Sequence, residues 1–210
     1  MILPGFPKPL IGRKGYSGPE FVGAFITNVA SGSPTLQIPQ GYSEGDLLIA
    51  IVLSGGSNFG APTPEGWEMK LFGVSGSSLF SRIATNNEPP SYLFTSTGTS
   101  RKTGIMLAYR GASMIDVVGE DTVSTPALSV AKSINLTEPG AIIGFWAWAS
   151  TGQPVALPPE MTLRTSWAGG LGPRAAVLDE PRAQAGPTGD RTFQWATTGG
   201  NKTARLISIR

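Results

Sequence analysis

Two apolar runs that lie 94 positions apart constrain the fold of this chain more than any other feature. The first is Leu47–Leu53, which reads Leu-Leu-Ile-Ala-Ile-Val-Leu and stands between turns at 43–46 and 54–56. The second is 141–147, with the sequence Ala-Ile-Ile-Gly-Phe-Trp-Ala. A short apolar run that contains β-branched residues and is bounded by glycine is typical of a strand in a sheet core. We therefore predict a central strand in each half of the chain.

The similarity between the two halves extends beyond these runs. The offset of 94 continues without a gap from Leu47 to Lys70, which aligns with Arg164. The closing segment Lys202–Arg210 aligns with Lys102–Arg110 at an offset of 100. Weaker correspondences join Ser33–Leu36 to Thr125–Leu128, 84–89 to 178–181, and Leu93–Phe94 to Phe193–Trp195. The sequence thus predicts two repeats, at about 21–111 and about 112–210.

Turn residues at regular intervals predict strands and almost no helix. Apolar or alternating runs recur at roughly 8–12-residue spacing with turn residues between them, which is typical of a β-sandwich or barrel. No window shows a sustained helical apolar period with caps. The expected strands of the first repeat are Phe21–Val29, Thr35–Ile38, Leu47–Leu53, Met69–Val74, Ser78–Thr85, Tyr92–Thr95 and Thr103–Tyr109. The predicted fold class is all-β, a jelly-roll-like β-sandwich built from two sequence repeats, with an extended N-terminal arm.

The junction between the repeats leaves two arrangements open. Independent domains are usually joined by an exposed polar linker. Here 111–116 reads Gly-Ala-Ser-Met-Ile-Asp and runs straight into the second repeat. We therefore favour one sandwich over 21–210 in which both repeats share a core, with two tandem domains as the alternative.

Residues 1–20 form the predicted arm. Its prolines and glycines prevent a helix and favour a polyproline-like extended chain, and it lacks the apolar core of a secretory signal. The arm is too apolar for a solvated tail, so it either packs along its own domain or lies in a groove of another subunit. The residues expected to bind such a partner are Ile2, Leu3, Phe6, Pro7, Pro9 and Leu10.

The composition limits the chemistry that the chain can perform. The sequence has neither cysteine nor histidine, which excludes disulfides, a Ser-His-Asp triad and a Cys-His pair. Acid–base work would fall mainly to carboxylates, and a glycosidase needs two of them facing each other across a cleft. The adjacent acids Glu120-Asp121 and Asp179-Glu180 do not meet this need, because neighbours in a strand point to opposite faces. We predict no catalytic residue, no cofactor and no enzyme activity.

Signals for ion, phosphate, nucleic-acid or membrane binding are weak. The loops 85–88 and 189–190 contain Asn or Asp, yet they lack the carboxylate spacing of a calcium site. The glycine-rich stretch Gly169–Pro173 lacks the Lys-Ser/Thr of a phosphate loop. The net charge is only +2, and no Lys/Arg run exceeds two residues. We therefore predict no metal site, no nucleic-acid partner and no membrane insertion.

Two tryptophans are candidates for a binding surface. Trp146 and Trp148 alternate with Phe145, so they share one face of their strand. The aligned residues in the first repeat, Val52 and Ser54, are smaller. The two rings either belong to the core or form a platform that stacks on a sugar or anchors an interface.

Several segments resemble bacteriophage virion structural proteins of the head-decoration, head-fibre or tail-fibre kind. They are Ile2–Leu10, Gly45-Asp46-Leu47-Leu48-Ile49-Ala50, Pro64-Glu65-Gly66-Trp67 and Ala108-Tyr109-Arg110-Gly111. The second repeat departs from them, since Glu160-Met161 stands in place of Gly-Trp. The low charged fraction of 14% and the abundance of Gly, Ser and Thr agree with such a surface.

The resemblance implies a non-enzymatic protein of the virion, assembled in the host cytoplasm. Its arm would attach to a capsid or tail protein of the same particle, its sandwich would be displayed outward, and it would form a homo-oligomer. The alternative is a carbohydrate-binding or host-adhesion module that binds a surface glycan through Trp146 or Trp148.

Overall fold

The chain folds entirely into strands, turns and irregular segments in the part that the structure describes. The computed structural model describes residues 18–54, 63–72, 76–96, 99–124, 127–148, 154–169, 173–196 and 202–210. These ranges contain no helix, and hence none that could span a membrane. The prediction of an all-β fold is confirmed.

The strands of the first repeat lie where the sequence predicts them. They are β1 (Glu20–Val29), β2 (Thr35–Gln37), β3 (Leu47–Ser54), β4 (Glu68–Phe72), β5 (Ser77–Ile83), β6 (Ser91–Leu93) and β7 (Lys102–Arg110). The described part of the predicted strand Met69–Val74 ends at Phe72, and 73–75 lie outside the described residues.

The second repeat contains the counterparts of these strands and several short additional ones. Its strands are β8 (Ile115–Val118), β9 (Thr122–Ser124), β10 (Leu128–Ala131), β11 (Asn135–Leu136), β12 (Gly140–Trp148), β13 (Pro154–Ala156), β14 (Thr162–Trp167), β15 (Arg174–Arg182), β16 (Gly186–Pro187), β17 (Arg191–Trp195) and β18 (Lys202–Ile209).

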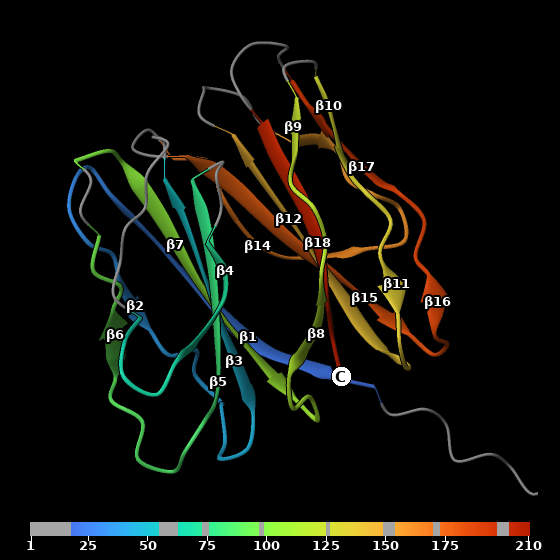
Figure 1. The fold of residues 1–210 in the computed structure, drawn as a ribbon. Coiled ribbons are helices and arrows are strands. Elements are labelled where there is room, and N and C mark those ends of the chain that lie inside the picture. Colours follow the sequence, from blue (N-terminus) through green and yellow to red (C-terminus); the bar gives the residue numbers. More distant parts are fainter. Residues whose placement is uncertain are drawn as a thin grey trace, which may run out of the picture.

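The two large sheets have the same strand order, one in each repeat (Figure 1). The first sheet runs β1-β7-β3-β5-β4, and the second runs β8-β18-β12-β15-β14, with β9 also paired to β18. All of these pairings are antiparallel. The predicted core strands, β3 and β12, are the central strands of their sheets. The internal repeat of the sequence therefore reappears as a repeat of topology.

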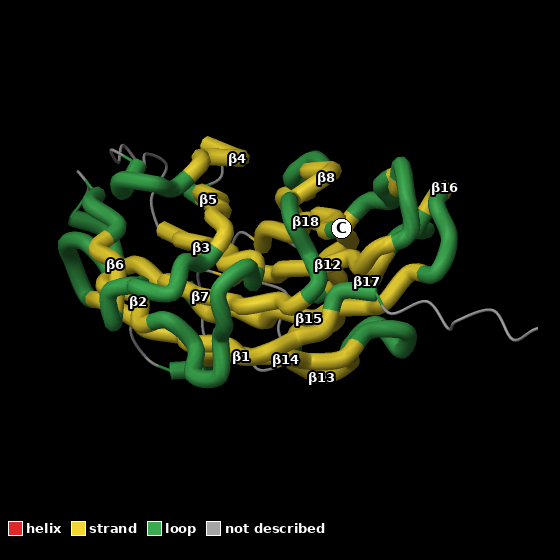
Figure 2. The backbone as a smooth tube through the Cα atoms, turned by 90° about the horizontal axis from the view of Figure 1, so that it is seen from below, coloured by secondary structure: helices red, strands yellow, loops and turns green. Residues whose placement is uncertain are grey.

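The two large sheets pack face to face and bury one shared cluster between them (Figure 2). In β3 the odd-numbered residues Leu47, Ile49, Ile51 and Leu53 point into this cluster. In β12 the corresponding positions 141, 143, 145 and 147 do the same. Because side chains alternate along a strand, the residues between them point to the outer face of each sheet.

Each outer face is covered by a smaller sheet, so the molecule has four layers. The pair β2-β6 covers the first sheet, and β10-β17-β13 covers the second (Figure 1). Leu48, Ala50 and Val52 pack under the first cover, with Leu36 and Phe94. The apolar runs Leu47–Leu53 and 141–147 are thus continuous because both of their faces are buried.

Two glycines in the large sheets allow bulky side chains to lie flat on them. A Cβ on Gly104 of β7 would stand 2.4 Å from Leu36, which belongs to the covering strand β2. A Cβ on Gly144 of β12 would stand 2.4 Å from the Trp146 ring. A larger residue at either position would push the covering layer away from the sheet.

One predicted correspondence between the repeats is wrong. The sequence alignment placed 178–181 opposite 84–89. In the structure Pro181 pairs with Ala141, whereas the residue that pairs with Leu47 is Ile83. Pro181 therefore corresponds to Ile83. The register of β5 on β3 and of β15 on β12 is set by which residues face the core, because a one-residue slip would turn every apolar side chain outward.

Candidate functional site

The structure describes one of the two sets of predicted binding residues. The predicted arm residues Ile2, Leu3, Phe6, Pro7, Pro9 and Leu10 lie outside the described residues. Trp146 and Trp148 are described, and they are 0% and 1% exposed. Both rings pack against the covering layer, Trp146 on Phe193 and Trp148 on Trp195. Neither ring therefore lies at the surface, where a ring that stacks on a glycan must lie.

The two large sheets approach each other at two edges, and the side chains at these two edges differ. At one edge β1 lies beside β14, and at the other β4 lies beside β8 (Figure 2). The equal strand order makes these two edges equivalent, because β1 corresponds to β8 and β14 corresponds to β4. They nevertheless carry different side chains.

The edge between β1 and β14, here called the closed edge, contains a connected network. The Tyr109 hydroxyl donates to Asp179 Oδ2 at 2.9 Å, across the two sheets. Arg164 Nε donates to Asp179 Oδ1 at 2.7 Å. The Arg164 guanidinium also lies 4.7 Å from the centre of the Phe21 ring. Burial raises the pKa of Tyr109 well above its ordinary value, and the charge and hydrogen bond of Asp179 raise it further.

The edge between β4 and β8, here called the open edge, has smaller side chains at the equivalent positions. Ser81 pairs with Ile49, and Asp179 pairs with Ile143, which lies 94 positions after Ile49. Ser81 therefore occupies the position that Asp179 has at the closed edge. Lys70 replaces Arg164 in the ungapped alignment. The pair Ile209–Ile115 replaces Tyr109–Phe21. Lys70 Nζ lies 2.5 Å from Glu68 Oε1 on its own strand instead of reaching across the sheets.

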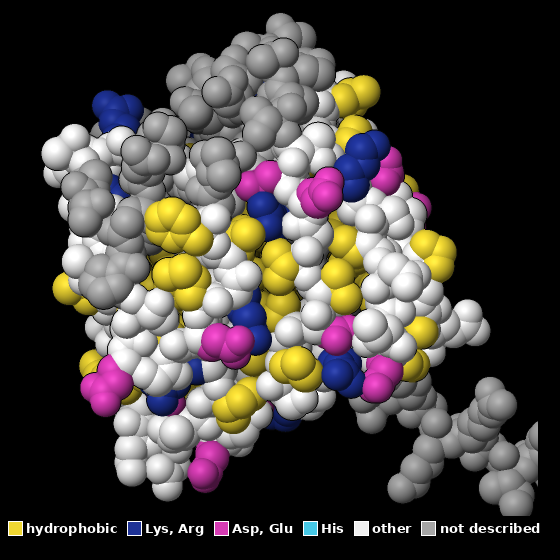
Figure 3. Space-filling model, viewed as in Figure 1, with side chains coloured by type: hydrophobic (Ala, Val, Ile, Leu, Met, Phe, Trp, Pro, Cys, Tyr) yellow, Lys and Arg dark blue, Asp and Glu magenta, His cyan; other side chains and the backbone are white. Residues whose placement is uncertain are grey.

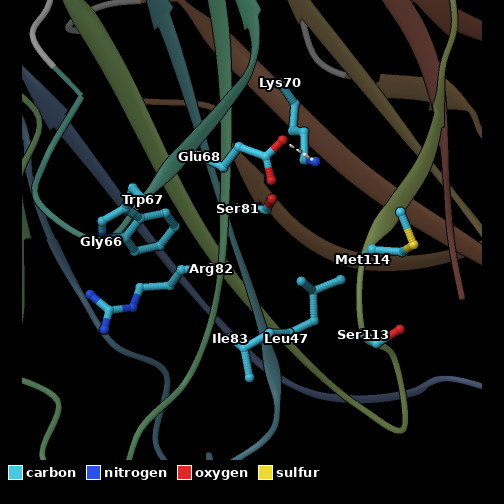
Figure 4. A pocket seen from close by; sticks show the side chains of 10 residues that line it. All are labelled: Leu47, Gly66, Trp67, Glu68, Lys70, Ser81, Arg82, Ile83, Ser113 and Met114. Carbon is cyan, nitrogen blue, oxygen red and sulfur yellow. Dashed lines mark ion pairs between the residues drawn. The ribbon is translucent and has the colours of Figure 1, made fainter.

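A pocket of about 240 Å³ lies at the open edge (Figure 4). It is lined by Leu47, Gly66, Trp67, Glu68, Lys70, Ser81, Arg82, Ile83, Ser113 and Met114. Figure 4 shows Met114 and Ser113 on one side of the pocket and the other lining side chains opposite them, with Trp67 and Arg82 farthest from Met114. Apolar side chains follow the hollow between the two halves of this surface, and charged side chains border it (Figure 3).

The charged side chains that line this pocket are Glu68, Lys70 and Arg82. Glu68 is the one carboxylate among its described lining residues, and it is already paired with Lys70. Elsewhere, Asp179 and Glu180 do point to opposite faces, as predicted, since Glu180 accepts hydrogen bonds from Arg191 at 2.7 and 3.0 Å on the outer face. Within the described ranges no three acidic side chains gather in a way that could hold a metal ion.

The acids of the two candidate calcium loops make contacts within the protein. Glu88 accepts hydrogen bonds from Tyr92 and Thr85 and pairs with Arg82 at 3.0 Å. Burial raises the pKa of Glu88, but these hydrogen bonds and the Arg82 charge bring it below its ordinary value. Asp190 pairs with Lys132 at 2.9 Å and accepts the backbone N–H of Ser133 at 2.9 Å. Both carboxylates thus fix loops of the fold.

Sequence reasoning missed a pair of buried lysines. Lys102 on β7 and Lys202 on β18 are both 0% exposed and occupy equivalent positions in the two repeats. Burial lowers the pKa of both amines. Lys102 Nζ donates to the Ser100 carbonyl at 2.9 Å, and Lys202 Nζ lies 4.9 Å from the Trp148 ring centre. Their alignment at an offset of 100 was the available signal.

Comparison with known proteins gives this arrangement no relative. No protein-family model, no curated protein and no solved structure matches the chain.

Proposed function

We propose that this chain is a non-enzymatic structural protein of a bacteriophage particle. It attaches to a capsid or tail protein through residues 1–20 and displays the two-repeat sandwich outward. The particle is the expected location, with assembly in the host cytoplasm, and the expected form is a homo-oligomer.

The observation that carries the proposal is the contrast between the arm and the body. The body is a four-layer sandwich in which Asp46, Glu88, Asp179 and Glu180 are each paired with an arginine. The arm precedes β1, and prolines at positions 4, 7, 9 and 19 lie among its apolar residues. An extended arm of this kind supplies main-chain hydrogen bonds and apolar anchors to a groove or sheet edge of a partner. Its prolines reduce the entropy that is lost on binding.

Deletion of residues 1–18 tests the proposal. The truncated chain should keep the far-ultraviolet spectrum and the melting temperature of the full chain, because β1 begins at Glu20. It should no longer co-sediment with purified particles, whereas the full chain should. Co-sedimentation of the truncated chain at the level of the full chain would contradict the proposal.

A matched pair of point variants separates apolar anchoring from arm length. Phe6→Ser with Leu10→Ser removes two apolar anchors and should weaken particle binding strongly. Lys8→Ser with Lys14→Ser changes as many arm residues and should weaken it less, in a salt-dependent manner. Equal loss in both variants would show that apolar contact does not dominate the attachment.

A further inference from the structure

The open-edge pocket lies beside a position at which the open edge has a serine and the closed edge has an acid. Ser81 of β5 lines the pocket, and Asp179 of β15 occupies the same position at the closed edge. There the Asp179 carboxylate accepts hydrogen bonds from the Tyr109 hydroxyl at 2.9 Å and from Arg164 Nε at 2.7 Å. The closed edge thus shows that a carboxylate fits this position.

A β-bulge places a cation at both edges. Arg164 of β14 and Lys70 of β4 each lie at a shift of register in the pairing of their strand, with β15 and with β5. A bulge changes the direction of the side chain at the extra residue. At the closed edge this arrangement brings Arg164 to Asp179. Lys70, which lines the pocket, is the equivalent donor at the open edge.

Lys70 has a partner that it can share with a ligand. It pairs at 2.5 Å with Glu68, whose side chain is 68% exposed. Such a solvated ion pair contributes little to stability, and an ammonium group has more than one N–H donor. The other cation of the pocket, Arg82, pairs with Glu88, whose side chain is buried. Lys70 is therefore the cation that can bind an acid from outside at the smaller cost.

Apolar side chains line the pocket beside these polar groups. Leu47 and Ile83 are paired on neighbouring strands, and Met114 lies opposite them (Figure 4). Ile83 and Met114 are 42% and 37% exposed, so a ligand that covers them removes apolar surface from water, which favours binding. The pocket volume of about 240 Å³ lies below the roughly 300–1,000 Å³ of pockets for drug-sized ligands, so the ligand is small.

We propose that the open-edge pocket binds a small carboxylic acid with an apolar body. The carboxylate of the ligand takes the place that the Asp179 carboxylate has at the closed edge, and it accepts hydrogen bonds from the Lys70 ammonium and the Ser81 hydroxyl. The apolar body lies between Ile83 and Met114. The pairing of two charges favours the acid over a neutral amide of the same shape. This site goes beyond the proposed function, because it involves neither the arm nor the particle.

Titration of the full chain with benzoate and with hexanoate, followed by NMR of the methionine methyl groups, tests the proposal. Met114 lines the pocket and reports binding, whereas Met161 is buried in the second repeat and serves as the internal reference. The Met114→Leu variant assigns the signal. Both acids should shift the Met114 methyl signal in a saturable manner, with a Kd in the millimolar range that is expected of such small ligands. Benzamide and hexanamide should bind at least about tenfold more weakly.

Variants of the pocket separate this site from non-specific binding. Lys70→Met should weaken benzoate binding at least about tenfold. The matched control Lys132→Met removes a surface cation that also pairs with an acid, Asp190, and should leave the affinity unchanged. Ser81→Asp should abolish binding, because the new carboxylate would occupy the place of the ligand acid. Glu68→Gln should strengthen binding, because it removes a competing acid and a like charge.

The proposal is wrong if neither acid shifts the Met114 signal at concentrations well above the millimolar range. Equal affinity for benzoate and benzamide would also overturn it, because the carboxylate would then not be recognised. Equal loss of binding in Lys70→Met and Lys132→Met would place the acid elsewhere on the surface and would overturn it too. The comparison of acid with amide uses the unaltered protein, so it remains decisive even if a variant does not fold.

Discussion

The closed and open edges of the sandwich occupy equivalent places in the two repeats, yet one is filled and the other is hollow. At the closed edge Asp179, Tyr109 and Arg164 connect the two sheets. At the open edge Ser81, Ile209 and Lys70 stand in their places, and a pocket remains. A duplicated topology therefore does not duplicate a site. Four exchanges distinguish the two edges: Asp179 to Ser81, Arg164 to Lys70, Tyr109 to Ile209 and Phe21 to Ile115.

A second exchange between the repeats inverts a charge and keeps it paired. Arg82 on β5 and Glu180 on β15 occupy equivalent positions under the covering layers. Arg82 is paired with Glu88, and Glu180 is paired with Arg191. The sign of the charge is inverted, but each partner is inverted too, so both sites remain paired. Both partners are exchanged at this site, whereas at the open edge Ser81 takes the place of the acid and a pocket lies beside it.

The largest expected effect is that of removing the acid at the closed edge. Asp179→Ala leaves the buried Tyr109 hydroxyl and Arg164 without their partner, which should cost about 3–5 kcal/mol of unfolding free energy. The matched change at the open edge, Ser81→Ala, should cost less than about 1 kcal/mol. Urea unfolding of both variants measures the difference. Equal losses would show that the two edges are not energetically distinct.

The cations of the two edges give the next largest contrast. Arg164→Met should cost about 2 kcal/mol, because it leaves Asp179, whose side chain is 5% exposed, with one partner fewer. Lys70→Met should change stability by less than about 1 kcal/mol, because its partner Glu68 is well solvated. The same urea titrations apply. A larger loss for Lys70→Met would place the structural joint at the open edge.

Alkaline pH should weaken the closed edge selectively. The pKa of Tyr109 is raised in the folded state, so its contribution is intact below its unfolded value and is lost as pH rises from about 10 toward the folded pKa. The loss from this group should be about 1.4 kcal/mol per pH unit. Tyr109→Phe should make the stability curve flatter by that amount between about pH 10 and about pH 11.5. Parallel curves for the variant and the wild type would contradict the assignment.

The smallest expected effect comes from adding the missing acid to the open edge. Ser81→Asp places a carboxylate near Lys70 in a solvated pocket and should change stability by less than about 1 kcal/mol. Urea unfolding measures this change, with Ser81→Ala as the matched control. A loss as large as that expected for Asp179→Ala would show that the open edge tolerates a change at this position no better than the closed edge.

Much of the fold could be predicted because strand signals are local. Alternation and turn residues placed all seven strands of the first repeat within a few residues, and the echo of Leu47–Leu53 at 141–147 identified the second central strand. The correspondence of 178–181 could not be predicted, because register depends on which distant strand a residue faces. The burial of Trp146 and Trp148 followed from the covering strands β10 and β17, which the alternation within β12 could not reveal.

The sequence by itself determined that this protein is a duplicated all-β chain with continuous apolar core strands. Both the side-chain period of two and the offset between the repeats are patterns of residue positions, so they can be recognised without a structure. Only the tertiary structure decided that Asp179, Arg164 and Tyr109 meet across two sheets while Ser81 and Lys70 leave a hollow. Contacts between residues 15 and 70 positions apart depend on how the sheets pack, and no local pattern encodes that packing.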